Sequence, residues 1–246
     1  MSALTVLYGV LLCAAAALLA AGTLRKIVQY SRTPAPLRIP TMPAPTTRLG
    51  VVLRMAREVV LFESLFRANK WTWVFGILFH AAMLVVVLGH LRYFTQPVWG
   101  WVVLLRPFGA YAGLAMLAGL GGLWLRRLLV DRVRYISGAS DHLMLLLLGA
   151  VALSGLTMRY LLHTDIVALK AFALGLLRLD WQPLPADPAL LIHLALVALL
   201  MAVFPFSKLL HAPGVFFQPT RYQVDNSREV RHVGSWTAAL ERQPDA

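Results

Sequence analysis

Four histidines of the 246-residue chain lie in or beside strongly apolar stretches, where an imidazole is an unusual side chain. They are His80, His90, His193 and His211. Polar side chains at membrane depth are costly and often mark a functional site. A single buried histidine is explained as well by a hydrogen bond to a serine or a carbonyl group of a neighbouring helix. Two histidines in each of two apolar stretches instead favour two sites, each with a pair of imidazole ligands.

Two imidazoles without a carboxylate or thiolate limit what such a site could hold. Zinc would be poorly served by this ligand set, whereas copper is compatible with the ligand type alone. A haem supplies four equatorial nitrogens of its own and needs only two axial ligands from the protein. We therefore expect one haem for each pair of histidines, two in all.

The expected haems are non-covalent haem b, because the chain has one cysteine, Cys13, and no CxxCH motif. Two axial imidazoles leave the iron without an open position. The expected chemistry is therefore electron transfer, and neither oxygen binding nor oxygen activation.

Long apolar helices must position these ligands. The chain is 59% hydrophobic and 14% charged, against about 25% charged residues in soluble domains. Uncharged runs close to the ~20 residues that a membrane helix needs occur at 3–24, 71–91, 107–125, 142–158 and 189–207. Because a backbone in lipid must satisfy its own hydrogen bonds, the sequence predicts an all-α, integral membrane bundle of five transmembrane helices. We expect a multi-pass protein of a bacterial or archaeal inner membrane.

The distribution of positive charge predicts the orientation. Alternate segments between the runs carry 18 and 5 of the 23 lysines and arginines, which places the N-terminus outside and the C-terminus in the cytoplasm. This bias also explains the net charge of +12, so no nucleic-acid partner is expected. The second and fifth helices then run in opposite directions, and two facing pairs result: His90 with His193 at the outer end, and His80 with His211 at the inner end.

The 18 residues between His193 and His211 are a whole number of turns at 3.6 residues per turn. We therefore expect His193 and His211 to face the same way, near the beginning and at the end of one continuous fifth helix.

The rest of the chain is expected to be organised around this bundle. We divide it into a first transmembrane helix (1–24), a cytoplasmic connector rich in proline with an amphipathic helix over 49–69 (25–70), the haem-binding membrane region (71–211) and a cytoplasmic tail (212–246). An apolar helix is expected in the loop 163–188, either as a lid over the outer end or as a simple connector.

Two stretches carry a resemblance to a known family. LFHAAMLVVVLGH (78–90) resembles the LFH-x9-H region of the respiratory nitrate reductase gamma subunit, and IHLALVALLMAVFPFSKLLH (192–211) is similar to the last helix of that family. The extended end FPFSKLLHAPGVFFQPTR (204–221) resembles the M subunit of the Dsr membrane complex, a member of the same superfamily. The likeness covers most of 70–215 and implies the same four axial ligands in the same pairs.

The resemblance also implies a partner and a substrate. It predicts electron exchange between quinone, as menaquinone or ubiquinone, and a cytoplasmic iron–sulfur subunit of heterodisulfide-reductase type, within a complex of several membrane subunits that serves dissimilatory sulfur metabolism. Sulfur oxidation would reduce quinone and sulfite reduction would oxidise quinol, so both directions remain open. The alternatives are a gamma subunit of respiratory nitrate reductase, which oxidises quinol for nitrate reduction, and a passive membrane anchor without redox function.

The quinone site implied by the resemblance involves Gly89, which matches a family glycine near that site. The family also has a lysine near the start of the third helix, and the nearest cation here is Arg106, several residues out of register. Further basic residues, expected on the inner surface, could dock the partner or merely reflect topological charge: Arg126, Arg127, Arg132, Arg134 and Arg221.

Overall fold

The five uncharged apolar runs form the five longest helices of the computed structural model, which describes residues 2–34, 38–232 and 234. These helices are α1 (Ala3–Arg32), α4 (Lys70–His90), α6 (Gly109–Leu129), α8 (Ala139–Tyr160) and α10 (Pro188–Val203). All five are long and apolar enough to cross a membrane, the last when it is counted on to Phe206. Within the described residues every regular element is a helix, so the predicted all-α fold with five membrane helices is confirmed. The orientation stays a prediction.

Shorter helices connect or follow these spans. They are α2 (Arg48–Leu61), α3 (Glu63–Ala68), α5 (Gly100–Leu105), α7 (Asp131–Tyr135), α9 (Ile166–Arg178) and α11 (Pro219–Tyr222), with the 3-10 helices η1 (Leu91–Tyr93), η2 (Phe204–Phe206) and η3 (Ala212–Phe217). The predicted segments 1–24, 25–70 and 212–246 extend to positions 1, 35–37, 233 and 235–246, which lie outside the described residues.

Side-chain caps fix where two membrane helices begin. The Asn69 side chain accepts a hydrogen bond from the Thr72 N–H at 2.8 Å, ahead of α4. The Asp187 side chain accepts one from the Ala189 N–H at 3.0 Å, ahead of α10. Each cap satisfies an N–H group that has no partner within its own helix. α1 ends at Arg32, beyond the predicted limit at residue 24. Pro34 explains this end, because a proline disfavours helical backbone at the residue before it.

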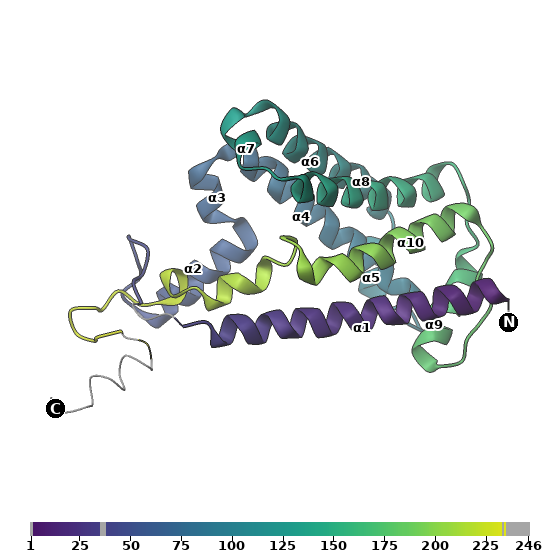
Figure 1. Cartoon of the computed structure of the whole chain (residues 1–246), viewed down its shortest axis with the longest axis horizontal. Helices are drawn as coiled ribbons and strands as arrows, with labels where there is room; N and C mark the ends of the chain where they lie inside the picture. The colour runs from purple at the N-terminus through teal and green to yellow at the C-terminus, as the bar shows by residue number, and fades with distance from the viewer. Residues whose placement is uncertain (1, 35–37, 233, 235–246) are drawn as a thin grey trace. The chain divides into compact units, whose positions relative to one another are not determined.

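The chain folds as two compact units. The first consists of residues 1–21 and 69–209, and the second of residues 22–68 and 210–246. In the first unit the membrane helices pack in series, α4 on α6, α6 on α8 and α8 on α10 (Figure 1). α4 and α10, both of which are described in full, do not pack closely on each other. The two helices that carry His80, His90 and His193 are therefore the first and last members of this series.

Two glycines of α6 allow α4 to approach closely. A Cβ atom at Gly119 would lie 2.8 Å from the Phe79 backbone nitrogen and 3.0 Å from the Phe75 carbonyl oxygen. At Gly122 it would lie 2.2 Å from a carbon of the Phe75 ring. Small residues at helix interfaces allow such close approach in membrane proteins. The core of the first unit forms beside this contact, from Phe79, Ala82, Ala112, Met116, Leu120 and Ala152.

The end of the first unit at which α4 finishes is called here the His90 end. The helix expected in the loop 163–188 is present there as α9, which packs against η1 directly after His90. Phe172 of α9 is almost fully buried and forms a core with Leu184 and Leu190. The Tyr8 hydroxyl of α1 donates to the Leu191 carbonyl at 3.1 Å. α9 is thus a packed cover of this end, which favours the lid over the simple connector.

The predicted single amphipathic helix over 49–69 is wrong in one respect, because it is split into α2 and α3 at Phe62, whose φ is 51°. The Glu58 carboxylate explains the break. It accepts a hydrogen bond from the Ser64 N–H at 3.2 Å, at the start of α3. It also forms a salt bridge with Arg221 at 2.9 Å. The first N–H groups of a helix have no partner within that helix. The Glu58 carboxylate supplies a partner for one of them, and this favours the start of a new helix here.

The proline-rich connector is held inside the second unit by backbone hydrogen bonds. Thr41 N–H donates to the Thr220 carbonyl at 2.9 Å, and Asp225 N–H donates to the Pro45 carbonyl at 2.9 Å. The buried Arg54 of α2 donates to the Thr41 carbonyl at 2.9 Å. These bonds satisfy backbone groups that prolines exclude from a helix or a sheet.

Substitution of Gly119 tests the contact between α4 and α6. Gly119→Ala is expected to lower the stability of the protein by about 1–3 kcal/mol, because the new methyl group meets backbone atoms that cannot move independently. Gly121→Ala on the same helix is the matched control, since a Cβ atom there meets nothing within 4 Å. Thermal unfolding in detergent measures both. Equal unfolding temperatures for the two variants would contradict the close contact.

Candidate functional site

The imidazoles of His80 and His90 are both held by carbonyl groups one turn earlier on α4. His80 Nδ1 lies 2.8 Å from the Gly76 carbonyl oxygen, and His90 Nδ1 lies 2.7 Å from the Val86 carbonyl oxygen. A carbonyl oxygen only accepts, so Nδ1 carries the proton in each ring. In the neutral imidazole the lone pair is then on Nε2, the atom that can bind a metal. Ten residues separate the two rings, or about 15 Å along the helix.

His193 reaches the same protonation state through a side chain of another helix. Its Nδ1 lies 2.8 Å from the Ser154 hydroxyl oxygen of α8. That hydroxyl donates its single proton to the Val151 carbonyl at 3.0 Å. The oxygen is therefore the acceptor for the His193 Nδ1–H, and the lone pair of this ring is also on Nε2.

The structure places two of the four predicted ligands at the His90 end. His90 directly precedes η1, which packs against α9, and Phe172 of α9 packs with Leu190, which precedes His193 on α10. α4 and α10 themselves do not pack closely on each other. His90 and His193 are the pair that the topology predicts for one site. The ring of His90 also meets the ring of Tyr93 edge-on, with centroids 5.8 Å apart.

The expectation that His193 and His211 share one continuous helix is wrong. α10 ends at Val203, and Pro205 lies in the 3-10 helix that follows. A proline removes a helical hydrogen bond and clashes with the preceding turn, so the whole-turn spacing does not apply. His211 precedes η3 and is exposed. It belongs to the second unit and His80 to the first, and their pairing stays a prediction from the sequence.

The chemistry of the donors at the His90 end fits a haem. Among the described residues no group of three or more His, Cys, Asp and Glu side chains is placed to hold a metal ion. A bare zinc ion would need such a group, whereas haem iron needs two protein ligands. The Nδ1–H hydrogen bonds of His90 and His193 add to the fit, because ligating imidazoles almost always donate their other N–H to an acceptor that orients the ring.

A half-buried cation beside His90 fits the carboxylate groups of a haem. Arg92 Nη2 donates to the Tyr93 hydroxyl at 2.6 Å. Arg92 Nε is buried, and it has no hydrogen-bond partner among the described residues. A buried N–H without a partner is costly, and a carboxylate is the strongest partner for a guanidinium. The Arg92 side chain is therefore suited to an anionic group at the His90 end.

The two residues predicted for a quinone site also lie at the His90 end. Gly89 precedes His90 on α4, and a Cβ atom there would meet no atom within 4 Å. Arg106 is exposed and directly follows α5, a helix that packs against α4 and η1. Open space beside Gly89 is thus adjacent in sequence to the predicted ligand His90.

A second polar cluster lies around Asp141 at the start of α8. Its buried carboxylate accepts from Lys208 Nζ at 2.9 Å and from the Gly138 N–H at 3.0 Å. Arg127 Nη1 lies 3.9 Å from the same carboxylate and donates to the Ser137 hydroxyl at 2.8 Å. Asp141 therefore caps α8 and ties it to the segment that follows α10.

His142 shows a different protonation from the predicted ligands. Its Nδ1 accepts a hydrogen bond from the indole N–H of Trp124 at 3.1 Å. An indole nitrogen only donates, so the lone pair of this ring is on Nδ1. That lone pair is already used within the protein, which separates His142 from His90 and His193.

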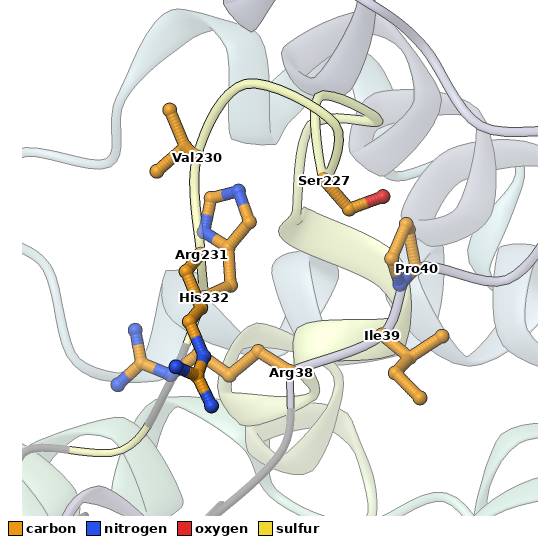
Figure 2. Close-up of a pocket in the computed structure, with 7 residues that line it drawn as sticks. All are labelled: Arg38, Ile39, Pro40, Ser227, Val230, Arg231 and His232. Atoms are coloured by element: carbon orange, nitrogen blue, oxygen red, sulfur yellow. The ribbon is translucent and has the colours of Figure 1, made fainter. Parts of the chain in front are cut away.

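A salt bridge within the second unit involves one of the basic residues that could dock a partner. Arg221 pairs with Glu58. The unit also has a pocket of about 250 Å³ (Figure 2), and none of the four predicted ligands lines it. Its lining residues are Arg38, Ile39, Pro40, Ser227, Val230, Arg231 and His232.

Sequence reasoning missed several residues of the site because their partners are distant in sequence. Ser154 is the one serine of the run 142–158, which is the signal that could have drawn attention to it. Its contact with His193 depends on how α8 and α10 pack. The link between Lys208 and Asp141 spans 67 residues and leaves no local pattern.

The chain is similar to known membrane proteins over most of its length. Residues 49–233 match the model of the nitrate reductase gamma subunit family. The chain is 34% identical over 280 residues to the Hdr-like menaquinol oxidoreductase cytochrome b-like subunit of Archaeoglobus fulgidus, with 95% of this chain and 84% of the relative covered. A protein of the same description from Archaeoglobus profundus is 34% identical over 264 residues, with 87% of this chain and 78% of the relative covered.

Neutralising Asp141 tests the cluster at the start of α8. Asp141→Asn is expected to destabilise the protein by about 1–3 kcal/mol, because buried hydrogen bonds to a charged group are lost or weakened. Asp131→Asn is the matched control, since it breaks an exposed pair with Arg134 that is expected to contribute about 1 kcal/mol or less. Thermal unfolding of both variants in detergent gives the comparison. A larger loss for the Asp131 variant would contradict the role of Asp141.

Proposed function

Because the chain belongs to the nitrate reductase gamma subunit family, we propose that this multi-pass membrane protein is the cytochrome b subunit of a respiratory redox complex. In this role it transfers electrons between the quinone pool and a cytoplasmic iron–sulfur subunit. The observation that carries the proposal is the pair His90 and His193. Their rings come from two helices that do not pack closely on each other, and both have the Nδ1–H bond and the Nε2 lone pair that axial ligation needs.

We assign His90 with His193 to one haem b and His80 with His211 to a second one. When bound, each haem supplies a one-electron redox couple within the membrane. With both imidazoles of a pair bound to its iron, a haem would have no free position for small ligands such as oxygen. The acceptors at Nδ1 hold the rings in place, and the apolar helices exclude water. Arg92 Nε is proposed to bind a haem propionate, which would satisfy its buried N–H.

The names of the two relatives support a more specific substrate and partner. Both are Hdr-like menaquinol oxidoreductase cytochrome b-like subunits, which favours menaquinol as the quinol and a cytoplasmic partner of heterodisulfide-reductase type. The resemblance of residues 204–221 to the M subunit of the Dsr complex supports a role in dissimilatory sulfur metabolism. The family model supports the alternative, the gamma subunit of a respiratory nitrate reductase. The type of soluble subunit that copurifies with the protein from native membranes distinguishes the two.

Replacement of His193 tests the haem assignment. His193→Ala is expected to remove about one of two haems per chain, because one axial ligand of one site is lost. The reduced-minus-oxidised absorbance spectrum and the extracted haem content of purified protein measure it. His163→Ala is the matched control, since His163 is exposed and follows α8, and it should retain both haems. An unchanged haem content in the His193 variant would overturn the assignment.

Filling the open space beside Gly89 tests the quinone site. Gly89→Val is expected to slow haem reduction by menaquinol by about 10- to 100-fold, because a displaced quinol loses its productive position. Haem content should stay unchanged, since the added side chain meets no protein atom near its Cβ. Gly149→Val, at another open helical position, should reduce at the wild-type rate. Menaquinol that reduces neither the wild type nor any variant would contradict the quinol function.

A further inference from the structure

We propose that Ser154 and Gly155 of α8 together position the His193 imidazole, and that the Ser154 hydroxyl sets the reduction potential of the haem that His193 holds. This inference rests on the proposed function. It concerns a positioning pair, because both residues would act on the haem only through His193.

The hydroxyl of Ser154 has a fixed direction. Its proton goes to the Val151 carbonyl on the same helix at 3.0 Å, so its oxygen presents a lone pair to His193 Nδ1 at 2.8 Å. The result is a relay of two hydrogen bonds from the imidazole through the hydroxyl to the backbone of α8. Such a relay can hold the ring in only one protonation state and one direction.

Gly155 supplies the room that this arrangement needs. A Cβ atom at this position would lie 3.3 Å from His193 Cε1 and 3.8 Å from its Nδ1. The ring thus lies directly against the backbone of α8, beside the hydroxyl that binds it. A methyl group at position 155 would push the ring away by a few tenths of an ångström, or tilt it.

His193 differs in this respect from the two ligands on α4. The acceptors for His80 and His90 are backbone carbonyls of Gly76 and Val86, which no side-chain substitution removes. The His193 ring is bonded to the Ser154 hydroxyl of a neighbouring helix, and the Val151 carbonyl is a backbone acceptor beside that hydroxyl. A change of one residue can therefore alter the hydrogen bond of this ring alone.

The direction of the effect follows from the chemistry of the imidazole. Donation from Nδ1–H to an acceptor raises the basicity of Nε2. A more basic ligand stabilises the oxidised, more positive iron and lowers its potential. Removing the acceptor at Ser154 should therefore raise the potential of one haem and leave the other unchanged.

The experiment compares variants of the full-length protein in purified membranes. Ser154→Ala removes the acceptor, Ser154→Thr keeps a hydroxyl, and Gly155→Ala presses on the ring. Thr157→Ala is the matched control, because Thr157 on the same helix also donates to a backbone carbonyl, that of Leu153, at 2.9 Å. Potentiometric titration of the haem absorbance separates the two components. Electron paramagnetic resonance of the oxidised protein reports the relative orientation of the axial rings.

The expected result is specific to one component. Ser154→Ala should shift one haem to a higher potential, Ser154→Thr should restore the wild-type value, and Gly155→Ala should change the resonance spectrum of that same haem. Loss of one haem from Ser154→Ala, with both haems kept in Thr157→Ala, would equally support a positioning role. That loss would reflect a roughly 10- to 100-fold weaker site.

Three results would overturn the inference. They are unchanged potentials and resonance spectra in both Ser154→Ala and Gly155→Ala, an equal shift of both haems, or the same shift in Thr157→Ala. Failure of the proposed function itself looks different, because the wild type would then lack two b-type haems or His193→Ala would retain both.

Discussion

A histidine in a membrane-spanning helix carries two ring nitrogens, and hydrocarbon offers a partner to neither. This constraint shapes the candidate site. The protein satisfies Nδ1 internally, through the Val86 carbonyl for His90 and the Ser154 hydroxyl for His193. Both acceptors fix the proton on Nδ1, so the lone pair of each ring is on Nε2. Satisfying one polar atom inside the membrane therefore also prepares the other for a metal.

The arrangement of helices makes this preparation useful. α4 and α10 lie at the two ends of a series that α6 and α8 complete, yet His90 and His193 lie at the same end of the first unit, which α9 links. The backbones of α4 and α10 do not pack directly on each other there. A flat group held between two imidazoles needs this separation. α9 and η1 complete the same end, with Phe172 buried among Leu184 and Leu190.

The sequence predicted the parts of the fold that depend on local composition. The uncharged runs became the long helices, and the apolar part of the loop 163–188 became α9. The prediction was wrong where a single residue determines the end or the start of a helix. Pro205 ends α10 before His211, and Glu58 starts a new helix after Phe62. Ser154 and Lys208 were missed as partners because their contacts come from packing between helices, which no periodicity in one segment records.

The notches that Gly119 and Gly122 leave in α6 have a consequence for the depth of His80 and His90. The Phe75 ring and carbonyl, with the Phe79 backbone nitrogen and Cβ, occupy these notches, so α4 can neither turn about its axis nor slide by one residue, a step of about 1.5 Å, without collision. His80 and His90 are rigidly attached to the same rod. The depth of both imidazoles in the first unit is thus set by one aromatic ring, the backbone beside it and two missing methyl groups.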